Sequence, residues 1–295
     1  MCFFSQTKWL QYLKNLTKQR RPFKTLCAKG LWETGLCRFF VIRKNGYCLQ
    51  FFPTAMSASL WIDPAAGIED EDFLRSFLRV GDTMVDVGAN IGSLSVLASV
   101  IVGKSGRVVA IEPHPRTYKY LEANLHLNKV QNCHMINVAI GTENGVCRLS
   151  DMKGDDQNKI AKDGCGFEVP MRRLDDICSS LPHIHLLKVD TEGYESFVFQ
   201  SATEVLSKTD CVYYESYEKN LTPNGVTVGD LVKILEQQRF MVFRKDRDAH
   251  FTRVDAHYHS EALENLIAVR DVSFLIERTG FLITSETSES DRVKR

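Results

Sequence analysis

Acidic residues and glycines are spaced in this sequence as they are in a nucleoside-binding site. Residues 84–92 read MVDVGANIG, so a short apolar run ends around Asp86 and a turn containing Gly88 and Gly92 follows. A second apolar run, residues 107–111, leads directly to Glu112. Ligands of open α/β sheets bind at the carboxyl ends of the strands, and an acid about 20 to 25 residues after a glycine-rich turn can accept hydrogen bonds from a ribose diol. The spacing therefore predicts a bound nucleoside.

The chemistry of the turn indicates which nucleoside is bound. A pyrophosphate-containing cofactor requires G-x-G-x-x-G, so that the turn and the helix N-terminus can hold phosphate. Here Asn90 takes the place of the middle glycine and Asp86 precedes the turn, where a carboxylate repels phosphate and suits a cationic ligand. S-adenosylmethionine has a ribose, an amino acid end and a sulfonium, but no phosphate. It is favoured over NAD, although a nicotinamide-dependent oxidoreductase and a non-catalytic cofactor-binding module are the alternatives.

A third acidic segment follows another apolar run. Residues 185–195 read HLLKVDTEGYE, and the run 186–189 ends at Asp190. We expect Asp190 at the same sheet edge as Asp86 and Glu112, where three carboxylates repel one another unless cations or hydroxyl groups are nearby. This convergence favours a functional site, and the alternative for Asp190 is the cap of the following helix.

Strands and helices alternate along the chain around these segments. Apolar residues at helical spacing follow the glycine turn as far as Gly103, and Pro115 suits the first turn of a helix that ends near Asn128. The third strand would end at residues 137–141, where Ala139 and its neighbours would contact an adenine ring through backbone groups. This alternation predicts a parallel α/β sheet. The expected strands are 84–87, 107–111, 132–140, 186–189, 211–215, 240–244 and 265–269.

Composition predicts an ordinary globular protein of one main domain. Of the 295 residues, 44% are hydrophobic and 25% are charged, with a formal net charge of zero, so nothing points to nucleic acid. The nine cysteines form no C-x-x-C pair, which predicts a reducing, cytoplasmic location. No signal peptide and no apolar run near the ~18 residues of a membrane span are present. The pair His257 and His259 is interpreted as loop, so no metal site is expected.

The first part of the chain is basic although the whole is neutral. No acid precedes Glu33, whereas seven lysine and arginine residues do. Apolar residues between Trp9 and Leu16 would share one face of a helix. Such a helix can lie on an anionic membrane as a peripheral contact, or it can pack on the domain as a solvated helix. Residues 37–42 and 47–52 flank Asn45-Gly46, which predicts a β-hairpin. We therefore expect an extension over 1–79, the main domain over 80–283 and a disordered tail over 284–295.

Taken together, these motifs resemble those of the FkbM family of S-adenosylmethionine-dependent methyltransferases. The resemblance covers about residues 80 to 245, and Thr191 departs from the apolar residue usual at that position. It is carried by residues 86–92, the pair Glu112-Pro113, residues 174–176 (LDD) and residues 187–195.

The resemblance implies a class I methyltransferase fold, which is Rossmann-like: a seven-stranded, mostly parallel sheet with helices on both faces. It implies S-adenosylmethionine as the cofactor and methyl transfer to a hydroxyl oxygen of a sugar, glycolipid or secondary metabolite. The first 80 residues carry none of these motifs, so we expect them to choose the acceptor, a small molecule or glycan. The implied cofactor-binding residues are Asp86, Gly88, Ala89, Asn90, Gly92, Glu112, Pro113, Ala139 and Asp190.

The reaction requires orientation and a base. The sulfonium methyl group is already activated, so the protein must align the acceptor oxygen with the S–CH₃ bond and exclude water. An alcohol must also lose a proton, and Asp190 or Glu192 is the nearest plausible general base, with Glu215 and His114 behind them. An amine acceptor, including a protein side chain, needs similar geometry and remains an alternative.

Overall fold

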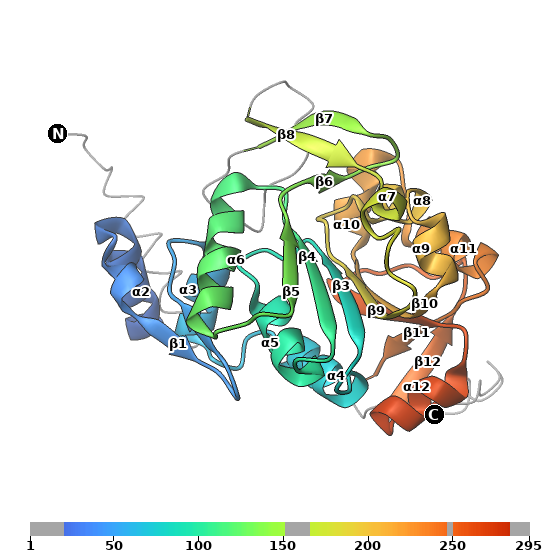
Figure 1. Cartoon of the computed structure of the whole chain (residues 1–295), viewed down its shortest axis with the longest axis horizontal. Helices are drawn as coiled ribbons and strands as arrows, with labels where there is room; N and C mark the ends of the chain where they lie inside the picture. Colours follow the sequence, from blue (N-terminus) through green and yellow to red (C-terminus); the bar gives the residue numbers. More distant parts are fainter. Residues whose placement is uncertain (1–20, 151–165, 247–249, 284–295) are drawn as a thin grey trace, which may run out of the picture.

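The computed structural model describes residues 21–150, 166–246 and 250–283 (Figure 1). The expected basic helix around Trp9 and the expected C-terminal tail lie outside these residues. Within the described part, no helix is both long and apolar enough to cross a membrane.

The core of the protein is a twisted sheet whose strands lie in the order β14-β12-β11-β13-β10-β9-β3-β4-β5. Strands β5, β4, β3, β9 and β10 are parallel, and β13 is antiparallel to both β10 and β11. These seven strands confirm the implied mostly parallel sheet. Their bounds are β3 Thr83–Val87, β4 Arg107–Ile111, β5 Cys133–Ile136, β9 Ile184–Val189, β10 Thr209–Ser216, β11 Met241–Lys245 and β13 Glu264–Val269.

Two further strands, β12 (His250–Val254) and β14 (Leu282–Ile283), extend the sheet to nine strands. Neither was expected from the sequence. Strand β12 mixes histidine, threonine and arginine with its apolar residues, and β14 contains only two residues, so neither has the apolar run of the inner strands. Both lie at the edge farthest from the glycine turn.

Helices cover both faces of the sheet, as the resemblance implied. Alternate side chains of one strand enter different cores: Met84 packs in one cluster and Val85 in the other. The first core receives Phe73, Leu97 and Leu121 from α4, α5 and α6. Its helices are α4 Ile68–Phe77, α5 Ser93–Val102, α6 Pro115–Leu127 and α12 Val272–Thr279; those of the second are α7 Leu174–Ile177, α8 Glu195–Gln200, α9 Thr203–Ser207 and α11 Val228–Gln237.

A small three-stranded sheet lies above the carboxyl edge of the main one (Figure 1). The expected strand 132–140 is interrupted, because the Asn137 side chain donates to the backbone oxygens of Glu112 and Pro113 at 2.8 and 3.0 Å. Strand β5 therefore ends at Ile136, and the chain enters the small sheet. Its strands are β6 Ala139–Ile140, β7 Gly145–Leu149 and β8 Phe167–Arg172.

The N-terminal extension packs beside α6 at one end of the molecule (Figure 1). The predicted hairpin is confirmed by the antiparallel pairing of β1 with β2, although each strand has only three residues. The elements of the extension are α2 Pro22–Thr34, the 3₁₀ helix η1 Leu36–Phe39, β1 Val41–Arg43, β2 Cys48–Gln50 and α3 Ala55–Ile62; the remaining elements of the chain are α10 Glu218–Leu221 and the 3₁₀ helix η3 Thr222–Asn224.

Asn124 of α6 and Asn128 at the C-cap of this helix join the extension to the main domain. Asn124 accepts from the Gln50 amide at 2.7 Å and donates to the Ile91 carbonyl at 2.7 Å. Asn128 accepts from the Cys48 amide at 2.8 Å and donates to its carbonyl at 2.6 Å. The backbone of β2 is thus hydrogen-bonded to these two side chains. Through Asn124, α6 is also hydrogen-bonded to Ile91 at the end of the glycine turn.

We expect Asn124→Ala to lower the free energy of unfolding by about 2 to 4 kcal/mol, because it leaves the Gln50 amide and the Ile91 carbonyl without partners. Urea unfolding would measure the loss. His126→Ala, at an exposed position of the same helix, is the matched control and should change stability by less than about 0.5 kcal/mol. Equal stabilities of the two variants would contradict the structural role of Asn124.

Candidate functional site

A cavity of about 720 Å³ opens at the carboxyl ends of β3, β4 and β9. It collects almost all of the residues that the sequence analysis selected from separate segments. Those in its lining are Asp86, Gly88, Ala89, Asn90, Glu112, Pro113, His114, Ala139, Asp190 and Glu192. Gly92 and Glu215 lie outside the lining. The Gly92 position opens space for α6, since a Cβ there would lie 2.4 Å from Cδ1 of Leu121.

Lys188 lies between the carboxylates of Asp86 and Asp190. Its Nζ is 3.2 Å from Asp86 Oδ1 and 3.4 Å from Asp190 Oδ2, and it donates to the Gly88 carbonyl at 3.0 Å. Burial alone would lower the pKa of Lys188, but the two carboxylates outweigh burial and raise it. The lysine is therefore the cation that allows the acidic strand ends to converge.

Asp86 interacts with Lys188 and Ser95 in the interior of the protein. Its side chain is completely buried, and its Oδ2 accepts from Ser95 Oγ at 2.5 Å while its Oδ1 faces Lys188. The sequence argument assigned its negative charge to a cationic ligand. In the structure, that charge is balanced by Lys188, so Asp86 shapes the wall beneath the glycine turn.

The turn itself requires an unusually close approach of two backbone segments. Gly88 has a φ of +79°, and a Cβ at this position would lie 1.8 Å from the carbonyl oxygen of Asp190. Asn90 also has a positive φ, +51°, which asparagine tolerates better than most residues. The strand ends of β3 and β9 are thus in contact at the cavity floor, which only glycine permits at position 88.

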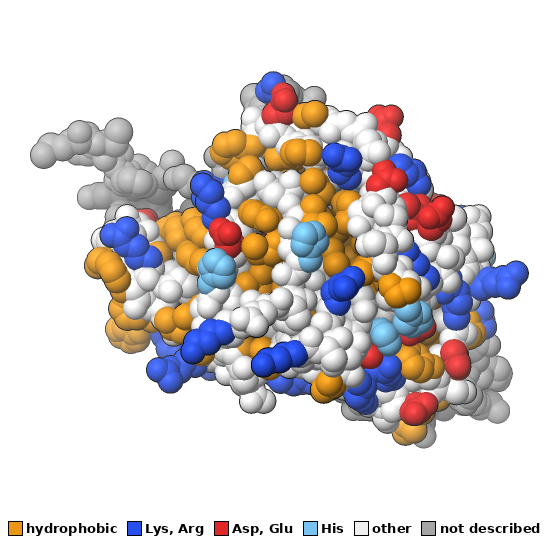
Figure 2. Space-filling model, viewed as in Figure 1, with side chains coloured by type: hydrophobic (Ala, Val, Ile, Leu, Met, Phe, Trp, Pro, Cys, Tyr) orange, Lys and Arg blue, Asp and Glu red, His pale blue; other side chains and the backbone are white. Residues whose placement is uncertain are grey.

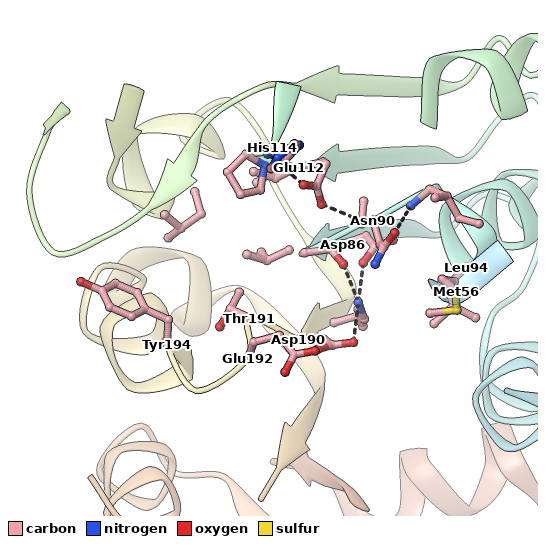
Figure 3. A pocket seen from close by; sticks show the side chains of 18 of the residues that line it. Met56, Asp86, Asn90, Leu94, Glu112, His114, Asp190, Thr191, Glu192 and Tyr194 are labelled. Carbon is pink, nitrogen blue, oxygen red and sulfur yellow. Dashed lines mark hydrogen bonds and ion pairs between the residues drawn. The ribbon is translucent and has the colours of Figure 1, made fainter. Parts of the chain in front are cut away.

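Glu112 presents a nearly buried carboxylate to the cavity. Its Oε2 accepts from the Asn90 amide and its Oε1 from the His114 amide, both at 2.9 Å (Figure 3). Burial raises its pKa to about 7, against the lowering effect of the two amides. Each oxygen keeps a second lone pair, so the group can accept two further hydrogen bonds from neighbouring hydroxyls.

Three carboxylates converge on the other side of the cavity floor. The side-chain oxygens of Asp190, Glu192 and Glu215 lie within 4.8 Å of one another. Asn220 Nδ2 donates to Glu192 at 3.0 Å and to Glu215 at 3.3 Å. Burial, followed by the charges of Asp190 and Glu192, raises the pKa of Glu215 to about 9, so this carboxyl carries a proton at neutral pH. The oxygens are also of the kind that hard divalent cations prefer.

The loop that carries Glu192 is held in a strained conformation. Glu192 has a φ of +55°, and the next residue, Gly193, has a φ of +98°. The buried carboxylate of Glu195 accepts from the Thr191 amide at 2.8 Å, the Thr191 hydroxyl at 3.0 Å and the Gly193 amide at 3.2 Å. These bonds fix the direction in which Glu192 leaves the backbone.

The remaining wall of the cavity comes from the extension and α4. Figure 3 places Met56 and Leu94 on the side opposite Tyr194, and Leu60 and Asp70 also line the cavity. Asp70 is fixed by the hydroxyl of Tyr213 at 2.5 Å and by Asn265 at 2.8 Å. Residues before position 80 thus contribute directly to the wall, where the sequence analysis expected acceptor choice.

The histidines of the late part of the chain do not gather around the cavity. His259 pairs with Glu218 at 2.9 Å, and His257 is exposed. Another group, His183, His185 and Asp210, has ligand atoms within 4.8 Å of one another. However, His185 accepts from the Thr83 amide at 3.0 Å and faces Asp82 at 3.3 Å, which gives it a structural role at the amino end of the sheet.

Sequence reasoning missed several residues of the site. Lys188 is polar within an otherwise apolar strand, a signal that could have paired it with the acids beside it. Asn220 and Asn224 have no such signal, because they follow β10 in a segment without periodicity. Val138 and Ile140 were not missed: they belong to the expected stretch 137–141 and line the cavity beside Ala139.

The sheet order, the glycine turn and the acid at the end of the second strand define a class I S-adenosylmethionine-dependent methyltransferase. The match to the family described as the methyltransferase FkbM domain covers residues 86–244, so the chain belongs to that family and its cofactor is S-adenosylmethionine. The nicotinamide alternative is therefore wrong.

Two curated relatives with similar sequences are named methyltransferases. The chain is 27% identical to Methyltransferase 1 of Beauveria bassiana over 178 residues, which cover 48% of this chain and 71% of that protein. It is 26% identical to the 2-O-methyltransferase NoeI of Sinorhizobium fredii over 195 residues, which cover 58% of this chain and 79% of that protein. Among solved structures, Aeropyrum pernix fibrillarin with natively bound S-adenosyl-L-methionine is 14% identical, with a TM-score of 0.39, and the match covers 68% of this chain and 74% of that chain.

We expect Lys188→Met to lower the free energy of unfolding by about 3 to 5 kcal/mol, because it leaves buried carboxylates without their cation. Chemical unfolding would measure this loss. The double variant Lys188→Met with Asp86→Asn should recover part of it, since the buried charge is then removed together with its partner. Asp86→Asn alone is measured as well. If the loss of stability in the double variant equals the sum of the losses in the two single variants, the two residues do not interact.

Proposed function

We propose that this protein transfers the methyl group of S-adenosylmethionine to a hydroxyl oxygen of a sugar, glycolipid or secondary metabolite. The observation that carries the proposal is the single cavity shared by the cofactor-type turn and the carboxylates of Asp190 and Glu192. The relative NoeI, named a 2-O-methyltransferase, supports the choice of oxygen.

The residues of the cavity fit the cofactor. The carboxylate of Glu112 would accept from the ribose hydroxyls with its remaining lone pairs. The turn at Gly88 to Asn90 would border the amino acid end. Val138, Ala139 and Ile140 offer apolar surface and backbone groups to the adenine ring, in a stretch without an acid. When bound, the cofactor supplies a methyl group activated by its attachment to sulfonium.

The protein's own contribution to transfer is orientation, exclusion of water and removal of a proton. Met56, Leu60 and Leu94 form an apolar wall that would hold the acceptor and limit water. Of the two candidate bases, Asp190 is already paired with Lys188, whereas Glu192 is directed by its positive φ and by Asn220. We therefore assign the role of general base to Glu192 and a supporting electrostatic role to Asp190. Glu215, whose raised pKa keeps it protonated, would not take up this proton, so Glu192 would release it to solvent when the product leaves.

We expect cofactor affinity to rise about tenfold between pH 6 and pH 8. Only ionised Glu112 accepts from both ribose hydroxyls, and a pKa of about 7 leaves about a tenth of the protein competent at pH 6. Calorimetric titration with S-adenosylhomocysteine across this range would measure the change. Glu112→Gln should bind more weakly at pH 8 and lose the pH dependence. A flat profile for the unaltered protein would contradict this role of Glu112.

We expect Glu192→Gln to lower kcat by about 10² to 10⁴-fold, because the acceptor hydroxyl then keeps its proton. The assay would follow transfer of labelled methyl groups to a panel of hydroxylated and amino acceptors, with the product linkage identified by NMR. Cofactor affinity should stay within about twofold, and Glu204→Gln, an exposed substitution of the same kind, should leave turnover unchanged.

Retained turnover in both Glu192→Gln and Asp190→Asn would remove these residues as bases. If the products are methylated only on nitrogen, the acceptor is an amine and the proposal of a hydroxyl acceptor is wrong. Cofactor binding without turnover on any acceptor of the panel would support a binding module over an enzyme of this specificity.

A further inference from the structure

Exposed apolar side chains are concentrated on the N-terminal extension. Fifteen large hydrophobic side chains are exposed in the described part of the chain, and six of them lie between residues 23 and 41. Single exposed apolar residues are normal on a protein surface, but a concentration within one small segment marks an interaction site. The six, which we name the apolar surface, are Phe23, Leu26, Leu36, Phe39, Phe40 and Val41, with Phe23 85% and Phe39 69% exposed.

Helix α2 has 13 residues, and Ala28 is its one buried side chain. One side of the helix is anchored to α3, where Arg21 forms an ion pair with Asp63 at 3.3 Å and donates to the Ile62 carbonyl at 3.1 Å. The rest of the helix faces outward with Phe23 and Leu26. The protein thus holds these apolar residues in place without using them in its own core.

Positive charge accompanies the apolar surface. Residues 21–44 contain six lysines and arginines and one acid, Glu33, in a chain whose formal net charge is zero. Three of the six form ion pairs, Arg21 with Asp63, Lys29 with Glu33 and Lys44 with Glu71, so the exposed Lys24, Arg38 and Arg43 carry the surface charge. Lys24 Nζ stands 5.7 Å from the ring of Trp61, and the Arg38 guanidinium stands 5.1 Å from the ring of Phe39. Figure 2 shows hydrophobic side chains gathered over α2 and β1 with basic side chains beside them.

We propose that the apolar surface docks the protein on a membrane that contains anionic lipids. Interfacial segments combine aromatic and aliphatic residues, which enter the boundary between headgroups and acyl chains, with lysine and arginine, which are attracted to anionic headgroups. The segment 23–43 supplies both on one folded scaffold. A second copy of the chain is a poorer occupant, because it would bring two basic surfaces together.

The docking surface is connected to the catalytic cavity through α3. Met56 and Leu60 of this helix line the cavity, whereas Trp61 and Ile62 contact α2 and the aromatic residues beside it. Packed helices have axes about 10 Å apart, so docking through α2 brings one wall of the cavity within a single helix layer of the lipid. Docking through these residues is independent of the nature of the acceptor.

The test is co-sedimentation of the full chain with vesicles of phosphatidylcholine and phosphatidylserine, and with vesicles of phosphatidylcholine alone. We expect binding to the mixed vesicles and a loss of about tenfold or more in the double variant Phe23→Ser with Phe39→Ser, since two apolar side chains no longer enter the interface. Arg38→Glu should weaken binding to the mixed vesicles and have little effect on the neutral ones.

Matched controls are Leu263→Ser, which removes a side chain that is 63% exposed elsewhere, and Lys104→Glu, which reverses an exposed charge outside the extension. Both should bind vesicles as the unaltered protein does, and all variants should retain their affinity for S-adenosylhomocysteine. The proposal is overturned if the unaltered chain fails to bind mixed vesicles or if the phenylalanine variant binds equally well. It is also overturned if the same variant abolishes a concentration-dependent dimer seen by ultracentrifugation while vesicle binding is unchanged.

Discussion

The organisation of this protein depends on one buried cation. Parallel strands that end in Asp86 and Asp190 place two carboxylates at neighbouring positions of one sheet edge, and Lys188 lies within 3.4 Å of both. Removal of such a charge from water is costly, and the cost is offset only by close partners on several sides. The lysine also donates to the Gly88 carbonyl, so the same residue joins the glycine turn to the acidic strand end. The floor of the cavity is therefore held together by the charge interactions of Lys188, and the side chains that line the cavity depend on this floor for their positions.

The sequence was sufficient for the order of the core elements, because each depends on local patterns. Apolar runs of four or five residues beside acids predicted β3, β4 and β9, and the Asn45-Gly46 turn predicted the hairpin of β1 and β2. Glu112 and Asp190 could be assigned to one edge because the carboxyl ends of parallel strands coincide. The substrate-facing wall was predicted only as a region, since the sequence before residue 80 has no motif that identifies Met56 or Leu60.

The remaining features depend on contacts between distant residues, which no local pattern contains. The break after Ile136 requires the side chain of Asn137 to reach the carbonyls of Glu112 and Pro113. Gly92 was predicted to border the ligand, but the space above it is taken by Leu121 of the next helix. The raised pKa of Glu215 likewise arises from its burial and from the approach of Asp190 and Glu192 in three dimensions. In each case the residue type was visible, whereas its partner was not.

The bonds of Asn124 and Asn128 have a bearing on how this family could be re-engineered or could diversify. The extension supplies part of the cavity wall, yet its hairpin is bonded to α6, and α6 in turn is bonded to the Ile91 carbonyl beside the glycine turn. The extension is therefore not an interchangeable module. A chimera that exchanges residues 21–79 for those of another member must also exchange the facing residues of α6, because an unmatched graft would disturb the glycine turn along with the cavity wall.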